Sequence, residues 1–169
     1  NNLRDISHKF SGKRVLLTGG RGFLGRYFME IFNELNKRVL KDKLQVVVLD
    51  NLITSGKEGS EIPIYENIKF IKHNVIKKFD FDKKIDFIIH AAGIASPYYY
   101  RAYPLETLEV AIKGTQNMLE LAESNSAKFT FFSSSEIYGD PDPKNIPTKE
   151  SYRGNLSCNG PRAVSYTHL

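Results

Sequence analysis

A glycine-rich stretch near the N-terminus has the spacing of a phosphate-binding loop. Residues 18–25 read TGGRGFLG, in which Gly19, Gly22 and Gly25 fit the pattern GxxGxxG and a GxGxxG pattern starts at Gly20. Such glycines permit a tight turn and let the backbone approach a pyrophosphate, while the helix that follows offers free N–H groups and the positive end of its dipole. The stretch therefore predicts a dinucleotide site, with a simple glycine turn between a strand and a helix as the alternative.

A carboxylate follows at a distance that suits the adenine ribose of such a dinucleotide. Asp50 closes the run QVVVL and lies 25 residues beyond Gly25, close to the spacing of about 20 residues expected for a residue that binds the ribose hydroxyls. A carboxylate at this place repels the additional phosphate of NADP. Arg21 argues mildly for NADP, and a plain turn residue is the other interpretation of Asp50. We expect NAD, because Asp50 would contact the ribose itself.

Short apolar runs and longer amphipathic ones alternate along the chain and must position these residues. Five runs have the composition of strands that are buried on both faces: 14–18, 45–49, 68–71, 85–90 and 128–132. Apolar residues at helical spacing predict helices over 23–37 and 104–123, the second with Pro104 in its first turn. This order predicts an α/β fold, a Rossmann-type doubly wound parallel sheet of five strands, with the carboxyl ends of the strands along one edge.

Each predicted helix has an apolar stripe, and a long loop follows the last strand. The stripe of the first helix comprises Phe23, Tyr27, Ile31 and Leu35, with Leu24, Phe28 and Phe32 beside it. The stripe of the second comprises Leu105, Leu108, Ile112, Leu119 and Ala122. Residues 140–161 hold four prolines and little periodicity, and we interpret them as a long functional loop.

The composition is that of an ordinary globular chain and excludes several classes of protein. The 169 residues suit one domain, and 41% are apolar and 25% charged. The net charge of +5 is mild and interleaved with acidic residues, so we expect no nucleic-acid partner. No apolar run approaches the roughly 20 residues of a membrane span, and the polar segment 1–13 is not a secretory signal. A single cysteine and four scattered histidines predict neither a disulfide framework nor a metal site, and suit a cytoplasmic setting.

Three further features have an open interpretation or favour a role without chemistry. His90 ends an apolar run, where a buried histidine with satisfied hydrogen bonds is favoured over a chemical role. The tyrosines at 98–100 could form a surface on which a substrate stacks, or could pack within a loop. The serines at 133–135 lack the His and Asp partners of a hydrolase triad.

Six segments, in order along nearly the whole chain, form one recognisable pattern. They are TGGRGFLG (18–25), VVVLDN (46–51), HAAGIASP (90–97), PLETLEVAIKGTQNMLELA (104–122), SSSEIYGDP (133–141) and GPRA (160–163). With them the chain resembles the extended short-chain dehydrogenase/reductase superfamily, the NAD-dependent nucleotide-sugar epimerases, dehydratases and decarboxylases. Within this superfamily the stretches 95–119 and 133–141 are most similar to those of the UDP-glucuronate decarboxylases.

The resemblance implies a role for each matching position. For the cofactor, NAD, it implies Gly19, Gly22, Phe23, Leu24 and Gly25 at the pyrophosphate, Asp50, Asn51 and Thr54 around the adenosine ribose, Asn74 and Val75 at adenine, and Ala91 and Gly93 at the nicotinamide ribose. For a nucleotide-sugar substrate, most simply a UDP-sugar, it implies contacts from Ser96 and Asn117, and catalytic roles for Ser134 and Glu136. Asn74 stands where the family has Asp; it keeps one acceptor oxygen and drops the charge, so we expect binding to survive.

The implied chemistry is hydride transfer to and from C4 of the sugar. A tyrosinate takes the proton of the C4 hydroxyl, Ser134 hydrogen-bonds the same oxygen, and a carboxylate at C5 of the 4-keto sugar leaves as CO₂. Dehydratases of the family place an Asp before the Glu, whereas this chain has Ser135, which is too weak an acid. We therefore expect decarboxylation, with 4-epimerisation and 4,6-dehydration as alternatives.

Two departures from the family pattern limit what the chain itself is expected to do. Ala111 replaces an asparagine of the second helix, and the family's catalytic Tyr and Lys after GPRA are replaced by VSYTHL, in which Tyr166 is one position late and no Lys follows. We interpret residues 1–163 as the NAD-binding part of a longer enzyme, a homodimer when intact, and 164–169 as a non-native tail. The chain as given is then expected to be inactive and prone to self-association at the edge strand 128–132, and a cofactor-binding fragment or regulator is the alternative from another class.

Overall fold

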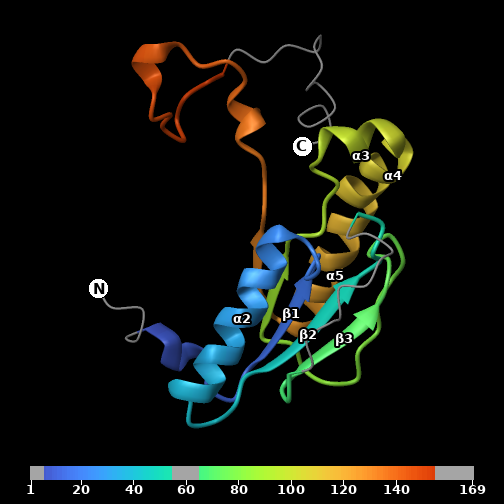
Figure 1. Ribbon diagram of the computed structural model, residues 1–169, viewed down its shortest axis with the longest axis vertical. Helices are drawn as coiled ribbons and strands as arrows, with labels where there is room; N and C mark the ends of the chain where they lie inside the picture. The colour runs from blue at the N-terminus through green and yellow to red at the C-terminus, as the bar shows by residue number, and fades with distance from the viewer. Residues whose placement is uncertain (1–5, 55–64, 155–169) are drawn as a thin grey trace.

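Five parallel strands form one twisted sheet at the centre of the molecule (Figure 1). The computed structural model describes residues 6–54 and 65–154. The strands are β1 (Arg14–Thr18), β2 (Gln45–Asp50), β3 (Ile68–Lys72), β4 (Phe87–His90) and β5 (Lys128–Phe131). Their order is β3-β2-β1-β4-β5, and every neighbouring pair is parallel. The predicted Rossmann-type sheet of five parallel strands is confirmed.

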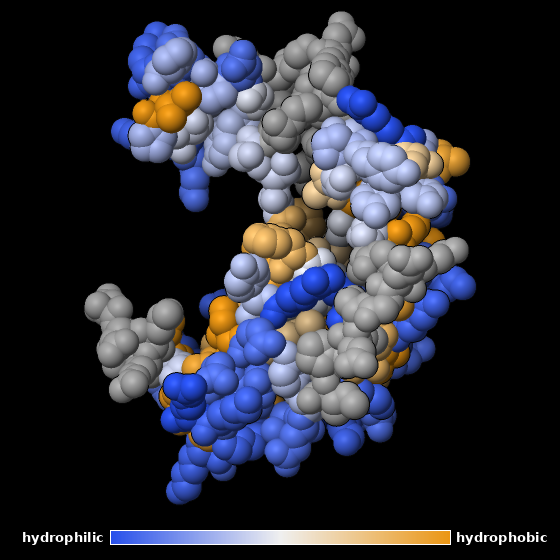
Figure 2. Space-filling model, viewed as in Figure 1, coloured by the Kyte–Doolittle hydropathy of each residue, from blue (hydrophilic) through white to orange (hydrophobic). Residues whose placement is uncertain are grey.

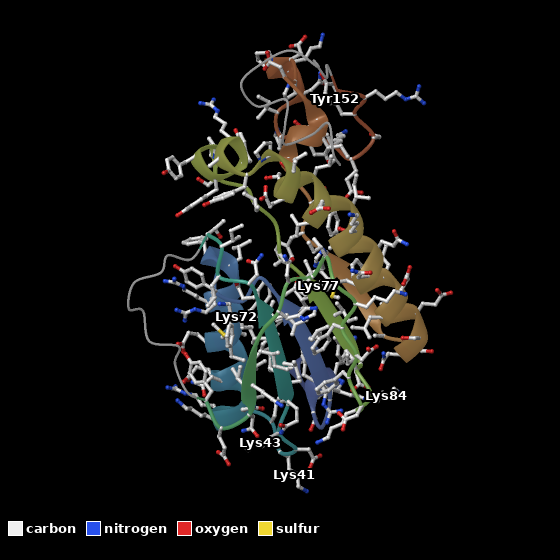
Figure 3. The ribbon with its side chains drawn as sticks, turned by 90° about the vertical axis from the view of Figure 1, so that its right-hand side faces the viewer. Lys41, Lys43, Lys72, Lys77, Lys84 and Tyr152 are labelled. Atoms are coloured by element: carbon white, nitrogen blue, oxygen red, sulfur yellow. The ribbon has the colours of Figure 1, made fainter. Side chains whose placement is uncertain are left out.

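Both faces of the sheet are buried, which explains why its strands are apolar without alternation. In β1, Val15 and Leu17 pack into one core cluster, and Leu16 packs into another on the opposite face. Helix α2 (Phe23–Arg38) covers the first face and α5 (Thr115–Asn125) covers the second, as Figures 1 and 3 show. The crossovers between parallel strands therefore bury the sheet as the sequence pattern requires.

The second predicted helix is interrupted, and a further helix precedes it. The chain from Pro97 to Asn125 contains α3 (Pro97–Ala102), α4 (Pro104–Glu109), the π-helical turn η2 (Val110–Gly114) and α5. The helix predicted over 104–123 is therefore present as a helical segment over 104–125, in which the π turn interrupts the α-helical hydrogen bonds. Of the tyrosines at 98–100, Tyr100 is buried against the fold and Tyr98 is exposed.

Only part of each apolar stripe predicted for the two long helices faces the sheet: Phe32 and Leu35 of α2 and Ala122 of α5 belong to or pack against the core. Phe23 is 76% exposed, and Tyr27 and Ile31 are also exposed, whereas the buried side of α2 comprises Gly25, Met29, Phe32 and Asn36. In the α4–α5 segment, Leu105 is 72% exposed and Ile112 and Leu119 are exposed, while the buried residues are Thr107, Gly114, Met118 and Ala122. Each helix thus turns a neighbouring face, partly polar or small, toward the sheet.

The last described segment leaves the carboxyl edge of the sheet after β5. Residues 132–154 extend beyond the strands and contain only two short 3₁₀ turns, η3 (Ser135–Tyr138) and η4 (Pro143–Asn145) (Figure 1). In the space-filling view this arm stands clear of α2, with a wide opening between them (Figure 2). The long loop expected over 140–161 is irregular as far as residue 154; the rest of it and the tail 164–169 lie outside the described residues.

β5 is an edge strand, as expected, and Phe131 and the following Phe132 are exposed beside it.

At the amino end of the chain, a short 3₁₀ turn, η1 (His8–Phe10), packs its Phe10 against the α2 side of the sheet. Within the two described ranges, no helix has the length and apolar character needed to cross a membrane.

A buried amide joins the end of α2 to the start of β2. Asn36 Nδ2 donates to the carbonyl of Leu44 and Asn36 Oδ1 accepts from the N–H of Leu44, both at 2.8 Å. Both residues are buried. The side chain therefore satisfies two backbone groups that neither a helix nor a strand pairs.

We predict that Asn36→Ala lowers the free energy of unfolding by about 2–4 kcal/mol, because it leaves two buried backbone groups without partners at about 1–3 kcal/mol each. Urea denaturation of both proteins measures the difference. Asn33→Ala on the same helix is the control and should change stability by less than about 0.5 kcal/mol. Equal losses in the two variants would contradict the role given to the buried amide.

Candidate functional site

The glycine loop after β1 presents bare backbone at the carboxyl edge of the sheet. Gly19 has a φ of +71°, and a Cβ there would lie 2.6 Å from the carbonyl oxygen of Ala91. A Cβ at Gly25 would collide with the carbonyl of Gly19, and one at Gly20 with the side chain of Val48. These positions therefore require glycine for packing as well as for the turn.

The start of α2 is suited to an anion. Gly22 is the N-cap residue, no side chain caps the helix, and its first turn holds no acidic residue. The first N–H groups of a helix have no acceptor within the helix, and the dipole places partial positive charge there. Phe23, Leu24 and Gly25 supply these groups. The backbone cradle and the uncapped helix start together fit the pyrophosphate of a dinucleotide.

The carboxylate of Asp50 is fixed in place by the backbone on both sides. Its Oδ2 accepts from the N–H of Arg21 in the glycine loop, and its Oδ1 accepts from the N–H of Leu52, both at 2.8 Å. Leu52 has a φ of +66°, which brings its N–H back toward the carboxylate. Asp50 is thereby held at the glycine loop, as its predicted role at the ribose requires.

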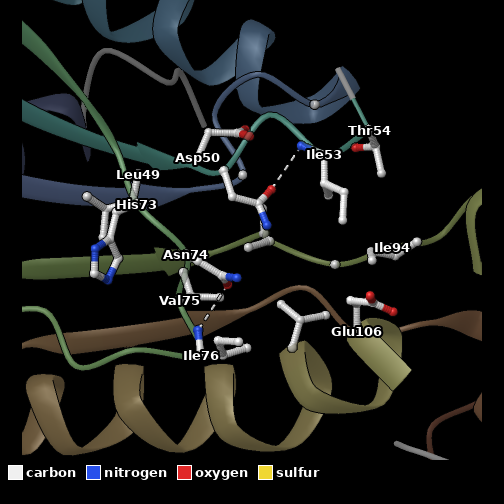
Figure 4. Close-up of a pocket in the computed structure, with 17 residues that line it drawn as sticks. Leu49, Asp50, Ile53, Thr54, His73, Asn74, Val75, Ile76, Ile94 and Glu106 are labelled. Carbon is white, nitrogen blue, oxygen red and sulfur yellow. Dashed lines mark hydrogen bonds between the residues drawn. The ribbon is translucent and has the colours of Figure 1, made fainter. Parts of the chain in front are cut away.

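A cavity lies between the glycine loop and the segments that follow β2, β3 and β4 (Figure 4). Its lining includes nine of the predicted cofactor residues: Gly19, Gly22, Asp50, Asn51, Thr54, Asn74, Val75, Ala91 and Gly93. The lining that the sequence did not predict comprises Leu49, Ile53, His73, Ile76, Ala92, Ile94, Glu106 and Val110. The structure thus brings together residues from five separate stretches of the chain.

An open groove adjoins this cavity, and the two share Gly22, Thr54 and Gly93. The groove is lined further by Arg21, Phe23, Arg26, Tyr27, Glu30, Ala95, Ser96 and Tyr99. Ser96, predicted to contact substrate, therefore lines the groove and does not line the cavity. Arg21 lines the groove and not the cavity that holds Asp50, which weakens the argument for NADP.

His90 is buried in a hydrogen-bonded network below the loop. The N–H of Ala92 donates to Thr18 Oγ1 at 3.1 Å, and Thr18 Oγ1 is hydrogen-bonded to His90 Nδ1 at 2.7 Å. The other ring nitrogen, Nε2, is hydrogen-bonded to Thr115 Oγ1 at 3.3 Å. Burial lowers the pKa of His90 from 6.5 to about 4, so the ring is neutral at pH 7. The histidine holds the ends of β1 and β4 together.

Asn117 supports the wall of the cavity and does not line it. Its Nδ2 donates to the carbonyl of Val75 at 2.8 Å. Gly114, one turn earlier, lies so close to Val75 that an added Cβ would be 2.9 Å from its Cγ2. Asn117 thus holds Val75, a residue predicted to border adenine, and its contact with substrate stays a prediction.

Ser134 and Glu136 lie on the arm that follows β5, and Ser134 lines neither the cavity nor the groove. The N–H of Phe132 donates to the carbonyl of His90 at 3.0 Å, so the arm leaves the sheet beside the segment that starts at Ala91. Ser134 is half-buried, and Glu136 belongs to η3 with its side chain outside the described part. Tyr166 lies outside the described residues as well. Among the residues described, no three His, Cys, Asp or Glu side chains cluster as metal ligands would.

Comparison with known proteins gives one family and consistent relatives. A model of the NAD dependent epimerase/dehydratase family matches residues 15–165. The chain is 38% identical over 152 residues to UDP-glucuronic acid decarboxylase 1 of Danio rerio, covering 89% of this chain and 34% of that protein. It is 35% identical over 162 residues to UDP-glucuronic acid decarboxylase 6 of Arabidopsis thaliana, covering 95% and 44%.

A solved structure agrees with these sequence relatives. The UDP-N-acetylglucosamine 4-epimerase from Methanobrevibacter ruminantium M1, in complex with UDP-N-acetylmuramic acid, superposes with a TM-score of 0.66 at 30% identity, covering 92% of this chain and 47% of that one. The chain thus spans between about a third and a little under half of the length of these three proteins.

We predict that stability falls as the pH is lowered from 6.5 to 4, because unfolded His90 takes up a proton near pH 6.5 whereas folded His90 does so only near pH 4. The contribution of His90 to the free energy of unfolding is complete above pH 6.5 and is lost as the pH falls toward 4, with a maximum of about 3 kcal/mol. Urea denaturation across this range measures it. Replacement of His90 by glutamine, which does not titrate, should flatten the dependence of stability on pH. Replacement of the exposed His8 by glutamine should not. A wild-type slope retained in His90→Gln would contradict the assignment.

Proposed function

Because the chain belongs to the NAD dependent epimerase/dehydratase family, we propose that it forms the cofactor-binding part of an enzyme that decarboxylates a UDP-sugar acid through a 4-keto sugar. The observation that carries the proposal is the contact between the glycine loop and Asp50. It holds a carboxylate beside the bare backbone of the loop, as binding of a ribose and a pyrophosphate would require. The decarboxylase relatives in animals and plants support the choice of reaction.

Different residues of the chain would bind different parts of the dinucleotide. The N–H groups at the start of α2 would hold the pyrophosphate, Asp50 would accept from the ribose hydroxyls, and Asn74 and Val75 would border adenine. Ala91 and Gly93 would lie along the nicotinamide ribose. When bound, the dinucleotide supplies the hydride acceptor that oxidation at C4 of the sugar requires.

Two residues after β5 would act on the sugar. The Ser134 hydroxyl would hydrogen-bond the C4 oxygen and fix its orientation, and Glu136 would lie at the reacting end of the sugar. Ser135 stands where a dehydratase has an acid for the departing hydroxyl, which favours loss of CO₂ over loss of water. We further propose that the proton of the C4 hydroxyl passes to a tyrosine that this chain does not supply in register.

A 4-epimerase is the second candidate, and the likeness to a UDP-N-acetylglucosamine 4-epimerase structure favours it. Epimerisation begins with the same oxidation at C4 but needs neither a carboxylate at C5 nor Glu136. Both candidates use the same cofactor site, so only the product distinguishes them.

We predict that the complete protein containing this chain converts UDP-glucuronate to a UDP-pentose with release of CO₂. Mass spectrometry of the product tests this. Loss of water would favour the dehydratase, and an unchanged mass with inverted C4 would favour the epimerase. Glu136→Gln should lower the rate of decarboxylation by roughly 10²–10⁴-fold if Glu136 transfers a proton during the reaction.

We predict that the chain binds NAD⁺ at least about tenfold more tightly than NADP⁺, because the carboxylate of Asp50 repels the 2′-phosphate. Asp50→Ala should weaken NAD⁺ binding and narrow the difference, since it removes the repulsion and the ribose hydrogen bonds together. Isothermal titration calorimetry with both dinucleotides measures the two affinities. Asp42→Asn, at the amino end of β2, is the control and should change neither. Tighter binding of NADP⁺ would show that Arg21 outweighs Asp50.

A further inference from the structure

Glu106 is a carboxylate in the wall of the cofactor cavity to which no role has been given above. It lies in the first turn of α4, and Val110, four residues later, lines the same cavity. Residues four apart share one face of a helix, so Glu106 belongs to the face that borders the cavity. Figure 4 shows it at the start of α4, across the cavity from Asp50 in this view.

The position of this helix relative to the adenine side of the cavity is fixed by close packing. Gly114 packs against the side chain of Val75, and Asn117 donates to the carbonyl of Val75. Both belong to the continuous helical segment that begins with α4. Glu106 is therefore held at a set distance from Asn74 and Val75, the residues proposed to border adenine.

The side-chain oxygens of two asparagines that line the cavity accept from nearby backbone N–H groups. Asn51 Oδ1 accepts from the N–H of Ile53 at 3.1 Å, and Asn74 Oδ1 accepts from the N–H of Ile76 at 3.3 Å (Figure 4). Their NH₂ groups, which only donate, remain to face a ligand. Each amide oxygen has one lone pair engaged and each NH₂ group only donates, so a carboxylate in the wall would be the stronger acceptor that the amino group of a base needs.

Glu106 is the carboxylate that meets this need. The other carboxylate of the lining, Asp50, accepts from backbone N–H groups at both oxygens. Within the described part of the chain the Glu106 side chain makes neither a hydrogen bond nor an ion pair, whereas its backbone carbonyl accepts from the N–H of Val110. An ionised carboxylate only accepts. We propose that Glu106 accepts a hydrogen bond from the exocyclic amino group of adenine and so determines base specificity, a proposal that rests on the dinucleotide site proposed above.

The donor and acceptor pattern of the base makes the proposal selective. Adenine carries an amino donor at C6 and an acceptor at N1, which match a carboxylate and an asparagine NH₂ group. Hypoxanthine carries an oxygen at C6 and an N–H at N1, so both positions are reversed. Its oxygen would face the negative charge of Glu106, and a site built for one hydrogen-bonding pattern rejects the other.

The test compares NAD⁺ with nicotinamide hypoxanthine dinucleotide by isothermal titration calorimetry on the 169-residue chain. We expect NAD⁺ to bind at least about tenfold more tightly than the hypoxanthine analogue. Glu106→Gln should reduce this ratio to about threefold or less, because the glutamine amide accepts from an amino group or donates to an oxygen. Glu109→Gln is the matched control, since Glu109 pairs with Lys113 outside the cavity, and should keep the wild-type ratio.

Each other outcome overturns the proposal in an identifiable way. Equal affinities of wild type for the two dinucleotides, or an unchanged ratio in Glu106→Gln, would refute base reading by Glu106 and leave the NAD site intact. An equal loss of both affinities in Glu106→Gln would make the residue structural, and its melting temperature would show this. Absence of binding by a folded wild-type chain to either dinucleotide would refute the proposed cofactor as well.

Discussion

The backbone of the glycine loop lies so close to the segment after β4 that no side chain fits between them. A Cβ at Gly19 would lie 2.6 Å from the carbonyl oxygen of Ala91, and a Cβ at Gly25 would collide with the carbonyl of Gly19. This close packing sets the spacing between the carboxyl ends of β1 and β4 and the start of α2. Because the loop has this shape, the N–H of Arg21 reaches the carboxylate of Asp50. The geometry of the cofactor cavity follows from that one close approach.

Buried polar groups then stiffen the edge of the sheet on either side of the loop. The Thr18 hydroxyl accepts from Ala92 and is hydrogen-bonded to His90, so β1 and the segment after β4 share one network. On the other side of the cavity, Asn117 holds the carbonyl of Val75. Such groups are costly to leave unpaired in a buried setting. A cavity whose walls are fixed before a ligand arrives loses less conformational freedom on binding.

The residues proposed to bind the cofactor and those proposed to act on the sugar lie on different kinds of structural element. The cofactor half is built from strand ends and the start of α2, which the sheet and its two core clusters hold in place. Ser134 and Glu136 are on the arm that extends beyond the strands (Figure 1). The proposed cofactor binding therefore depends on the packed sheet, whereas the proposed roles of Ser134 and Glu136 depend on a loop-like segment placed beside it.

The sequence by itself determined the strands, the glycine loop and Asp50, because each depends on local features: continuous apolar runs, glycine spacing, and a carboxylate at a strand end. Sequence patterns did not decide which side of each helix meets the sheet. In α2 the apolar stripe through Phe23 and Tyr27 is exposed and Met29 is buried, because neighbouring stripes of one helix are both apolar and only the shape of the sheet selects between them. Glu106 joined the cavity for the same kind of reason: it borders residues far away in sequence, and only the packing of the α4–α5 segment against Val75 brings it there.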